Sequence, residues 1–413
     1  MTEHIYDVVV VGAGFAGAGA ARDLAAAGRD VLIVEGKGQV GGRTFLRRFA
    51  GSTLRIEMGG TWILPASDRH VLEELARYGM TTVDSPAPAN FVTLIGGSAF
   101  TWGELPAEIA AEFDSLSRTD ARNLGAALAG LSPEARDWGR AWTRYLCGAS
   151  PEEITADILR GDMSEVTIEL MKDVDEHSTS IHGGTTELIS RMLDDAATDL
   201  RLDTRVTQIE QSDGLVRVKS VDAEFVARYA LIAVPITTWS DIRFEPPMPG
   251  IQAEIGSGGN VGHSLKAWIL ARDVPRLFRG VSGSGDLAYL RTERDFEDGT
   301  SLLVGFGDDV DFDLTDLERV QQAVRAFVPD AKVLRVDGHD WNRDAFARGT
   351  WMAPTATGPT AYLPEARRPL GRVHFAGGDI AEFMPSTIEG AIESGRAGAS
   401  AIDSLLEATR DAS

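Results

Sequence analysis

A glycine-rich turn between two apolar segments at the N-terminus constrains the fold of this chain more than any other feature. Residues 5–11, IYDVVVV, are apolar and β-branched, as in a strand of a parallel sheet that is covered on both faces. The pattern GAGFAG, an alanine-rich stretch and a second apolar run, DVLIVE, follow in that order. A strand, a glycine turn, a helix and a second strand in one short unit are typical of a dinucleotide-binding α/β fold.

The glycines and the acid of this unit have distinct mechanical roles. Gly12 allows the tight turn, Gly14 lets backbone N–H groups approach a pyrophosphate, and Gly17 lets the helix pack closely against the strand. The helix N-terminus adds a partial positive charge. Glu35 ends the second strand, where its carboxylate can accept hydrogen bonds from ribose hydroxyls. The unit predicts a bound dinucleotide and leaves both NAD and FAD open.

Paired glycines follow the second strand at two places. GGRT occupies residues 41–44, and EMGGTW occupies residues 57–62 after a short strand-like stretch. Arg43 can neutralise a phosphate through a bidentate contact, and paired glycines let the backbone pass close to a flat ring. The alternative for Arg43 is an exposed arginine in a loop.

Further motifs recur in order along nearly the whole chain. IHGGTTELI and LDTRVTQIE stand in the middle, and VHFAGGD followed by IEGAIESG stands near the C-terminus. With the N-terminal motifs they resemble the flavin-containing amine oxidase (monoamine oxidase) superfamily. The stretches PITTWSDIRFEPPMP, GHSLKAWI, LLVGFGDDVDFDLTD and DWNRDAFARGTWMAP resemble its bacterial branch that includes 6-hydroxy-L-nicotine oxidase. The resemblance implies that the dinucleotide is FAD.

The resemblance also assigns residues to the FAD. Val206 stands where the family holds the adenine, Asp379 where many members carry a glutamate near the pyrophosphate, and Ile388 where an N–H faces the flavin pyrimidine. Thr350 stands where membrane-bound animal members carry the cysteine that is linked to the flavin, so noncovalent FAD is expected. The glycine pattern and the resemblance together give the expected cofactor residues: Gly12, Gly14, Phe15, Ala16, Gly17, Glu35, Gly36, Gly42, Arg43, Gly59, Gly60, Thr61, Val206, Trp341, Gly378, Asp379, Thr387 and Ile388.

The order of the motifs predicts two domains. Because nucleotide motifs lie at both ends and in the middle, the Rossmann-like FAD-binding domain must be discontinuous, with residues 1–84, 178–245 and 340–413. Residues 85–177 and 246–339 are expected to form an α+β substrate domain with a mixed sheet and helices. Within it, HSLKAWILA alternates like a strand, and DLERVQQAVRAFV has the periodicity of a helix.

Lys266 is the first candidate for the chemistry. The alternation of HSLKAWIL places Ser264, Lys266 and Trp268 on one face of the strand. A lysine in such a strand is ordinarily an exposed edge residue. Family members, however, carry a lysine here that is hydrogen-bonded through water to flavin N5 and implicated in reoxidation by oxygen. The resemblance therefore favours a functional Lys266.

The amine site is expected to contain aromatic residues. Trp351 matches the first residue of the family's aromatic cage, and Thr387 stands at the second position, where many monoamine oxidases have tyrosine. The incomplete cage indicates a substrate whose shape differs from that of simple primary arylalkylamines. Lys266, Trp351 and Thr387 are thus the catalytic candidates. The candidate pocket residues are Trp62, Tyr145, Tyr289, Trp351 and Phe383, all of types that also fill ordinary cores.

The resemblance implies oxidation of an amine to an imine. A hydride equivalent passes to flavin N5, the imine hydrolyses to an aldehyde or ketone, and dioxygen is reduced to H2O2. Alternatives within the superfamily are a dehydrogenase or desaturase, and an L-amino-acid oxidase in which Arg144 or Arg291 binds the carboxylate. A flavin-free binding protein is a further alternative, against which the intact Glu35, Arg43 and Lys266 argue.

Composition narrows the partners. The chain of 413 residues has 62 acidic and 40 basic residues and a formal net charge of -22, which disfavours nucleic acid and anionic membranes. A single cysteine, Cys147, excludes an intrachain disulfide and cysteine-based metal motifs, and no metal is expected. With no signal peptide or spanning segment evident, we expect a cytoplasmic protein. Its expected partners are a small amine and O2 or another electron acceptor, and a homodimer stays open.

Overall fold

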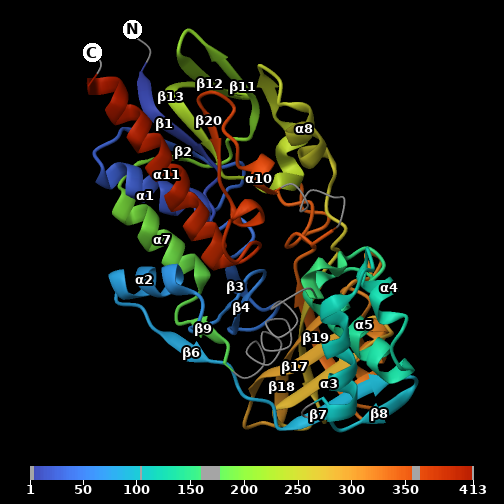
Figure 1. The fold of residues 1–413 in the computed structure, drawn as a ribbon. Helices are drawn as coiled ribbons and strands as arrows, with labels where there is room; N and C mark the ends of the chain where they lie inside the picture. Colours follow the sequence, from blue (N-terminus) through green and yellow to red (C-terminus); the bar gives the residue numbers. More distant parts are fainter. Residues whose placement is uncertain (1–3, 103–104, 160–176, 356–362, 412–413) are drawn as a thin grey trace.

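The computed structural model describes residues 4–102, 105–159, 177–355 and 363–411 (Figure 1). Two large sheets organise these residues, and helices pack on each of them. Both ends of the chain lie beside the first sheet, next to helix α11 (Ile388–Asp411) (Figure 1). The chain therefore leaves the first sheet for the second and returns to it before it ends.

The first sheet has eight strands in the order β10-β2-β1-β13-β12-β11-β14, with β20 paired to β13. Strands β2 and β13 run parallel to β1, and β20 runs parallel to β13. Strand β12 runs antiparallel to both of its neighbours, β13 and β11. The strands are β1 (Ile5–Val11), β2 (Val31–Val34), β10 (Asp199–Arg201), β11 (Val206–Ser212), β12 (Leu215–Ser220), β13 (Glu224–Ile232), β14 (Arg243–Glu245) and β20 (Val373–Phe375).

Strand β1 is buried on both faces, as its continuous apolar sequence predicts. Val8 and Val10 pack with helices α1 and α11 on one face, and Val9 and Val11 pack with β12 and Trp239 on the other. Helix α1 contacts both α7 and α11, so these helices form one layer. Their bounds are α1 (Phe15–Ala26), α7 (Thr185–Ala196) and α11 (Ile388–Asp411). The predicted α/β fold class is confirmed, and the sheet is parallel from β10 to β13 but antiparallel where β12 joins β13 and β11.

The second sheet has seven strands in the order β19-β15-β18-β17-β16-β7-β8. It is mixed, because β16 runs parallel to β7 whereas the other neighbours run antiparallel. Helix α5 (Pro133–Cys147) packs on one face and helix α9 (Leu317–Phe327) on the other. The strands are β7 (Asn90–Ile95), β8 (Ser98–Phe100), β15 (Leu265–Arg272), β16 (Phe278–Ser282), β17 (Tyr289–Asp295), β18 (Thr300–Gly307) and β19 (Lys332–Gly338).

Smaller elements connect and cover the two sheets. The strands are β3 (Leu46–Arg48) paired with β4 (Arg55–Glu57), and β9 (Thr179–Ile181) between β5 (Trp62–Ile63) and β6 (Thr82–Asp84). The further α-helices are α2 (Arg69–Arg77), α3 (Ala107–Asp114), α4 (Leu124–Leu128), α8 (Gly250–Ser257) and α10 (Leu363–Ala366). Short 3₁₀ turns include η3 (Ile236–Asp241) and η5 (Gly378–Ile380).

The strands divide between the segments that the motifs predicted. All strands of the eight-stranded sheet come from residues 1–84, 178–245 and 340–413, and all strands of the seven-stranded sheet come from 85–177 and 246–339. The domain boundaries themselves stay a prediction. No helix among the described residues is long and apolar enough to cross a membrane. The described residues also contain no group of three or more His, Cys, Asp or Glu side chains able to hold a metal.

Candidate active site

A cavity of about 560 Å³ extends from the N-terminal glycine turn to Trp351 and Tyr145. Residues of both sheets and of the loops between them line it. Every expected cofactor residue except Gly17 is among the lining residues. A Cβ atom on Gly17 would lie 1.9 Å from the carbonyl oxygen of Gly12, so this glycine permits close packing behind the turn instead of facing the cavity.

The start of helix α1, just after the glycine turn, lines the cavity. Helix α1 starts after Gly14 with no side-chain cap and no acidic residue in its first turn. Among the described residues its first N–H groups have no side-chain cap, so they suit an anion such as a pyrophosphate. Gly12 has φ of +107°, and a Cβ there would lie 2.8 Å from the carbonyl oxygen of Ala233. The turn thus needs glycine for both its conformation and its space.

Glu35 is placed to bind hydroxyl groups. Its side chain is buried, and its two carboxylate oxygens accept hydrogen bonds from the backbone N–H groups of Ala13 and Lys37, each at 2.8 Å. Burial raises the pKa of this carboxyl above its usual value, although these N–H groups oppose the shift. Each oxygen keeps a lone pair that can accept a further hydrogen bond. Because Val206 lines the same part of the cavity, this end fits a nucleoside.

Arg43 and Asp379 form an ion pair in the cavity wall. Arg43 donates through one guanidinium nitrogen to the carbonyl of Thr350 at 2.6 Å and lies through the other 2.7 Å from Asp379 Oδ1. Asp379 is buried and also accepts from the N–H of Ile236 at 3.1 Å. The pair ties the two cavity-lining segments together. A contact between Arg43 and a phosphate stays a prediction.

Lys266 lies in the middle of the second sheet, not on an edge, because β15 is paired with both β18 and β19. Its ammonium nitrogen donates to the carbonyl of Gly59 at 2.9 Å and to the hydroxyl of Thr61. The same nitrogen lies 4.4 Å from the ring centroid of Trp62 and 4.8 Å from that of Trp268. The side chain is thus held between two indoles at the cavity wall.

Burial lowers the pKa of Lys266 from an ordinary 10.5 to about 7. The carboxylates of Glu57 and Glu293 oppose this shift, and the guanidinium of Arg291 adds to it. The surrounding carbonyl, hydroxyl and indole groups therefore only partly replace the water that a free ammonium would have. A lysine in this setting can change its charge near neutral pH.

The aromatic wall differs in part from the expected one. Trp62, Tyr145 and Trp351 line the cavity. Tyr289 does not line it, because its ring is stacked behind that of Tyr145 at a centroid distance of 4.1 Å. Phe383 does not line it either and is 52% exposed, because the next residues, not Phe383, turn toward the cavity. The sequence predicted both residues in the pocket, and the structure places neither in the wall of this cavity.

Sequence reasoning missed Phe306 and Met384, which both line the cavity. Phe306 pairs in register with Lys266 across β15 and β18, so the two side chains emerge side by side from the same sheet face. The alternation of SLLVGFG carries this signal, but the register of two strands cannot be read from either alone. Met384 has a positive φ of 47°, a loop conformation that no sequence pattern predicted.

Thr387 lines the cavity, but its hydroxyl serves helix α11. It donates to the carbonyl of Met384 at 2.7 Å and accepts from the N–H of Gly390 at 3.0 Å, so it caps the helix N-terminus. The short side chain of Thr387 cannot offer the aromatic face that a tyrosine would offer. The incomplete aromatic cage at Trp351 and Thr387 stays a prediction.

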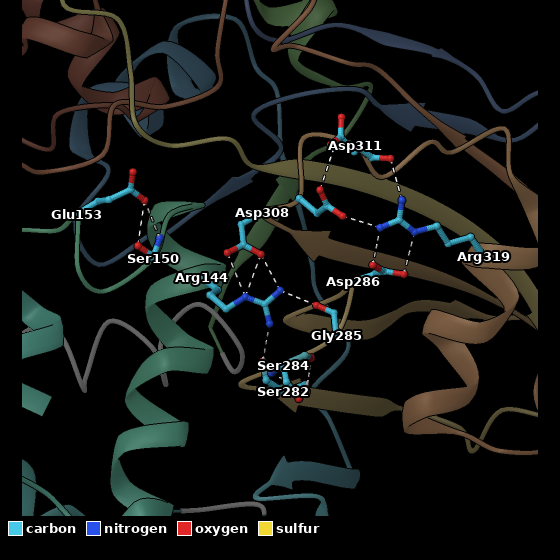
Figure 2. A network of polar contacts seen from close by, with 11 residues as sticks. Arg144, Ser150, Glu153, Ser282, Ser284, Gly285, Asp286, Asp308, Asp311 and Arg319 are labelled. Carbon is cyan, nitrogen blue, oxygen red and sulfur yellow. Dashed lines mark hydrogen bonds and ion pairs between the residues drawn. The ribbon is translucent and has the colours of Figure 1, made fainter. Parts of the chain in front are cut away.

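Neither arginine proposed for a carboxylate lines the cavity. Arg144 is paired with Asp308, as Figure 2 shows. Arg291 is 2% exposed, and its guanidinium carbon lies 4.7 Å from the ring centroid of Trp62. The positions of both residues disfavour the amino-acid oxidase alternative.

Buried polar atoms in the wall support the presence of a ligand. The hydroxyls of Ser264 and Thr350 and the indole nitrogen of Trp62 have no hydrogen-bond partner in the described part of the protein, and all three residues line the cavity. Buried polar groups are normally paired, and leaving one unpaired is costly. Together with the uncapped start of α1, these atoms fit a polar ligand in the cavity.

Comparisons with known proteins agree with this geometry. The sequence model of the family described as flavin containing amine oxidoreductase matches residues 15–403. The (S)-6-hydroxynicotine oxidase of Paenarthrobacter nicotinovorans is 30% identical over 424 residues, which cover 96% of this chain and 99% of that protein. The nicotine dehydrogenase of Pseudomonas putida is 30% identical over 432 residues, which cover 95% of this chain and 87% of that protein. The solved structure of cyclohexylamine oxidase from Brevibacterium oxydans has the same fold, with a TM-score of 0.81, 22% identity and coverage of 98% of this chain and 100% of that one.

Proposed function

The chain belongs to the flavin containing amine oxidoreductase family, and we propose that it is an amine oxidase that uses noncovalent FAD and dioxygen. One observation carries the proposal. Lys266 and Trp351 line one cavity with Gly14, Glu35 and the other residues that fit a dinucleotide. The reacting end and the cofactor end are therefore parts of a single site.

FAD, when bound, takes up a hydride equivalent from the carbon next to the amine nitrogen and passes two electrons to dioxygen, so that one amine and one O2 give one imine and one H2O2. The residues that would hold it are those of the glycine turn, Glu35, Arg43 and the N-terminus of α11. Thr350 carries a hydroxyl, not a thiol, at the position expected for a covalent link, which supports noncovalent binding.

The aromatic wall orients the amine and removes water from it. Trp351, Tyr145 and Phe306 offer flat apolar surfaces, against which a substrate nitrogen and its neighbouring C–H bond can be held in one geometry. An apolar wall also disfavours a charged ammonium, so the bound amine loses its proton more easily. A neutral nitrogen has the lone pair that assists loss of hydride from the adjacent carbon. The imine then leaves and hydrolyses in water to an aldehyde or ketone.

Lys266 places a titratable nitrogen beside the cavity. Its hydrogen bonds to Gly59 and Thr61 fix the nitrogen at the wall that Trp62 also lines. In its charged form it would stabilise negative charge that develops nearby when oxygen is reduced. In its neutral form it can accept a proton. Both forms are accessible near neutral pH because of its lowered pKa.

We expect a substrate whose shape differs from that of a simple primary arylalkylamine. The capping hydroxyl of Thr387 leaves one side of the amine end without an aromatic face. Relatives at 30% identity are named for 6-hydroxynicotine and nicotine, whose amines are cyclic. We therefore propose a secondary or cyclic amine. Since one of these relatives is named a dehydrogenase, an acceptor other than dioxygen is the second candidate.

The test is a panel of primary, secondary and cyclic amines mixed with the purified holoprotein. Under anaerobic conditions, an accepted amine should bleach the visible flavin absorbance, and admission of air should restore the colour with release of H2O2. If no amine bleaches the flavin, the proposed function is wrong. If bleaching occurs but air restores the colour only slowly, the protein is a dehydrogenase with another acceptor.

A further inference from the structure

Helix α5 forms part of the wall at the amine end of the cavity. Tyr145 and Leu146, in its last turn, line the cavity. The carbonyl of Leu146 accepts a hydrogen bond from the indole nitrogen of Trp351 at 2.6 Å. A carbonyl in the last turn of a helix has no partner within the helix, so the indole also satisfies an otherwise free acceptor. The orientation of the Trp351 ring therefore depends on where the end of α5 lies.

An ion pair fixes α5 to the second sheet. The guanidinium of Arg144 donates to both carboxylate oxygens of Asp308, at 2.9 and 3.0 Å from Nε and at 2.6 Å from one terminal nitrogen. That terminal nitrogen also donates to the carbonyl of Gly285 at 2.7 Å. Figure 2 shows the guanidinium between Asp308 and the turn of Ser282, Ser284 and Gly285. One side chain of α5 thus joins two separate loops of the sheet.

The partners of Arg144 stand directly behind the cavity wall. Asp308 follows the last residue of β18 and is two residues from Phe306, which lines the cavity. Gly285 lies in the turn between β16 and β17, just before Tyr289. The ring of Tyr145 stacks on that of Tyr289 with an angle of 10° between the planes, and it meets the ring of Phe306 edge-on at 5.2 Å. The ion pair and the ring contacts therefore fix the same helix turn on the same strands.

We propose that Arg144 is a positioning residue for amine oxidation: through Asp308 it holds the last turn of α5 where the Leu146 carbonyl orients Trp351 and Tyr145 closes the cavity wall. This inference rests on the proposed function. It assigns Arg144 a role different from the carboxylate binding that its sequence position suggested. The guanidinium does not touch the amine and acts only through the helix.

The fork of Arg144 matters as much as its charge. A lysine would keep the positive charge but offers a compact ammonium in place of a planar pair of donors. A lysine at position 144 would keep one contact with Asp308. It would lose the second carboxylate contact and the hydrogen bond to the carbonyl of Gly285. A neutral side chain at position 144 would leave the partly buried Asp308 carboxylate without its partner, which is costly. The expected order of function is therefore wild type, Arg144→Lys, then Arg144→Gln.

The test is a double-mutant cycle with Arg144→Gln, Asp308→Asn and the combined variant, all as FAD holoproteins. Stopped-flow measurement of anaerobic flavin reduction gives the limiting rate and the amine dissociation constant separately. Each single change should lower the limiting rate about tenfold and retain bound FAD, and the combined change should lower it no further, because both remove the same ion pair. Arg144→Lys should recover part of the rate.

Arg319→Gln is the matched control. Arg319 belongs to the same polar network, where it pairs with Asp286 and Asp309 (Figure 2), but it lies on α9, which packs on the sheet face opposite to α5. Its removal should leave the limiting rate unchanged. If Arg144→Gln reduces its flavin at the wild-type rate, or if Arg319→Gln is impaired equally, the positioning role is wrong.

A second measurement separates this inference from the proposed function. Near-ultraviolet circular dichroism spectra are recorded with and without Trp351→Phe in the same background. The difference between the two spectra is the signal of the Trp351 indole. In the Arg144→Gln background this difference should shrink, because the indole is less fixed. An unchanged difference overturns the inference whether or not the protein oxidises amines. Failure of every amine to reduce the wild-type flavin would overturn the proposed function alone.

Discussion

The buried lysine shows how a single residue can connect stability with chemistry. Lys266 is 5% exposed and is surrounded by two indoles, a carbonyl and a hydroxyl. These groups bind an ammonium less well than water does, so the charged form costs free energy in the folded state. Lys266 lies at the wall of the candidate active-site cavity. A costly group retained in such a place points to a functional reason.

Lys266 should make the stability of the fold depend on pH. With a pKa lowered from 10.5 to about 7, the folded protein has released this proton between these pH values while the unfolded chain still holds it. Raising the pH through this window therefore stabilises the wild-type fold relative to Lys266→Met, by at most about 1.4 kcal/mol per pH unit. Below pH 7 the lysine is protonated in both states, and the difference should be flat.

Urea unfolding of both proteins, at several pH values from 6 to 9.5 with the same excess of FAD, measures this difference. The change of this difference with pH removes the titration of groups that the substitution leaves unaffected, and the lost hydrogen bonds of Lys266 add an offset to it. A difference that stays constant as the pH rises above about 7 would show that the lysine keeps its ordinary pKa in the fold.

At the scale of elements, the end of α5 and the start of β15 depend on each other. Gly148, the residue after α5, has φ of +58°, and a Cβ atom there would lie 2.6 Å from the backbone nitrogen of Ser264. The carbonyl of Gly148 accepts a hydrogen bond from the N–H of His263 at 2.6 Å. Strand β15 begins at the next residue after Ser264 and carries Lys266. The turn of Gly148 therefore sets the distance between the aromatic wall and the lysine.

Gly148→Ala should be more damaging than an ordinary substitution at a helix end. An alanine in the left-handed region costs about 1 to 2 kcal/mol by itself. At this position the new methyl group would also push on the backbone before β15, so we expect a further loss of at least about 1 kcal/mol and a lower kcat/KM. Gly79→Ala is the control, because Gly79 has φ of +62° after helix α2 and no heavy atom within 4 Å of its Cβ position. Equal losses of unfolding free energy in the two variants would show that the contact with Ser264 is unimportant.

Elements with a strong local signal could be predicted, and contacts between distant elements could not. The alternation of HSLKAWIL correctly put Lys266 and Trp268 on one face of β15, and the periodicity near DLERVQQAVRAFV correctly predicted α9. The ion pair of Arg144 with Asp308 joins residues that are 164 positions apart. Neither residue carries a local pattern that names its partner, so the role of Arg144 became visible only in the folded chain.

At the scale of the whole molecule, one cavity collects residues from nearly the full length of the chain. Its nucleotide end could be predicted because a glycine turn depends on backbone conformation, which leaves a clear mark in the sequence, and because the acid Glu35 follows that turn at the end of the next strand. Its amine end could be predicted only in part. Tyr289 and Phe383 are aromatic like their lining neighbours, but whether an aromatic side chain faces a cavity or lies behind it depends on packing between separate elements.

A ligand that fills this cavity should stabilise the entire protein. Residues from both sheets line it, so a bound FAD would contact parts of the chain that are far apart in sequence. A ligand that binds only the folded state stabilises it by about 2.7 kcal/mol when its concentration is 100 times the dissociation constant. Removal of FAD should therefore lower the melting temperature by several degrees, and added FAD should restore it. Noncovalent binding further predicts that acid precipitation releases all of the flavin into the supernatant as FAD.

Two comparisons test which end of the cavity provides this stabilisation. FMN has the flavin but lacks the adenosine that would lie near Glu35 and Val206, so it should restore the melting temperature of the apoprotein much less than FAD does. Glu35→Gln replaces two carboxylate acceptors by one amide oxygen and an N–H₂ group that cannot accept from ribose hydroxyls. This substitution should raise the dissociation constant of FAD about tenfold or more and leave the small stabilisation by FMN unchanged. If FMN stabilises the apoprotein as well as FAD, or if flavin remains on the acid-precipitated protein, the cavity does not hold the dinucleotide in the way that its glycine turn and Glu35 indicate.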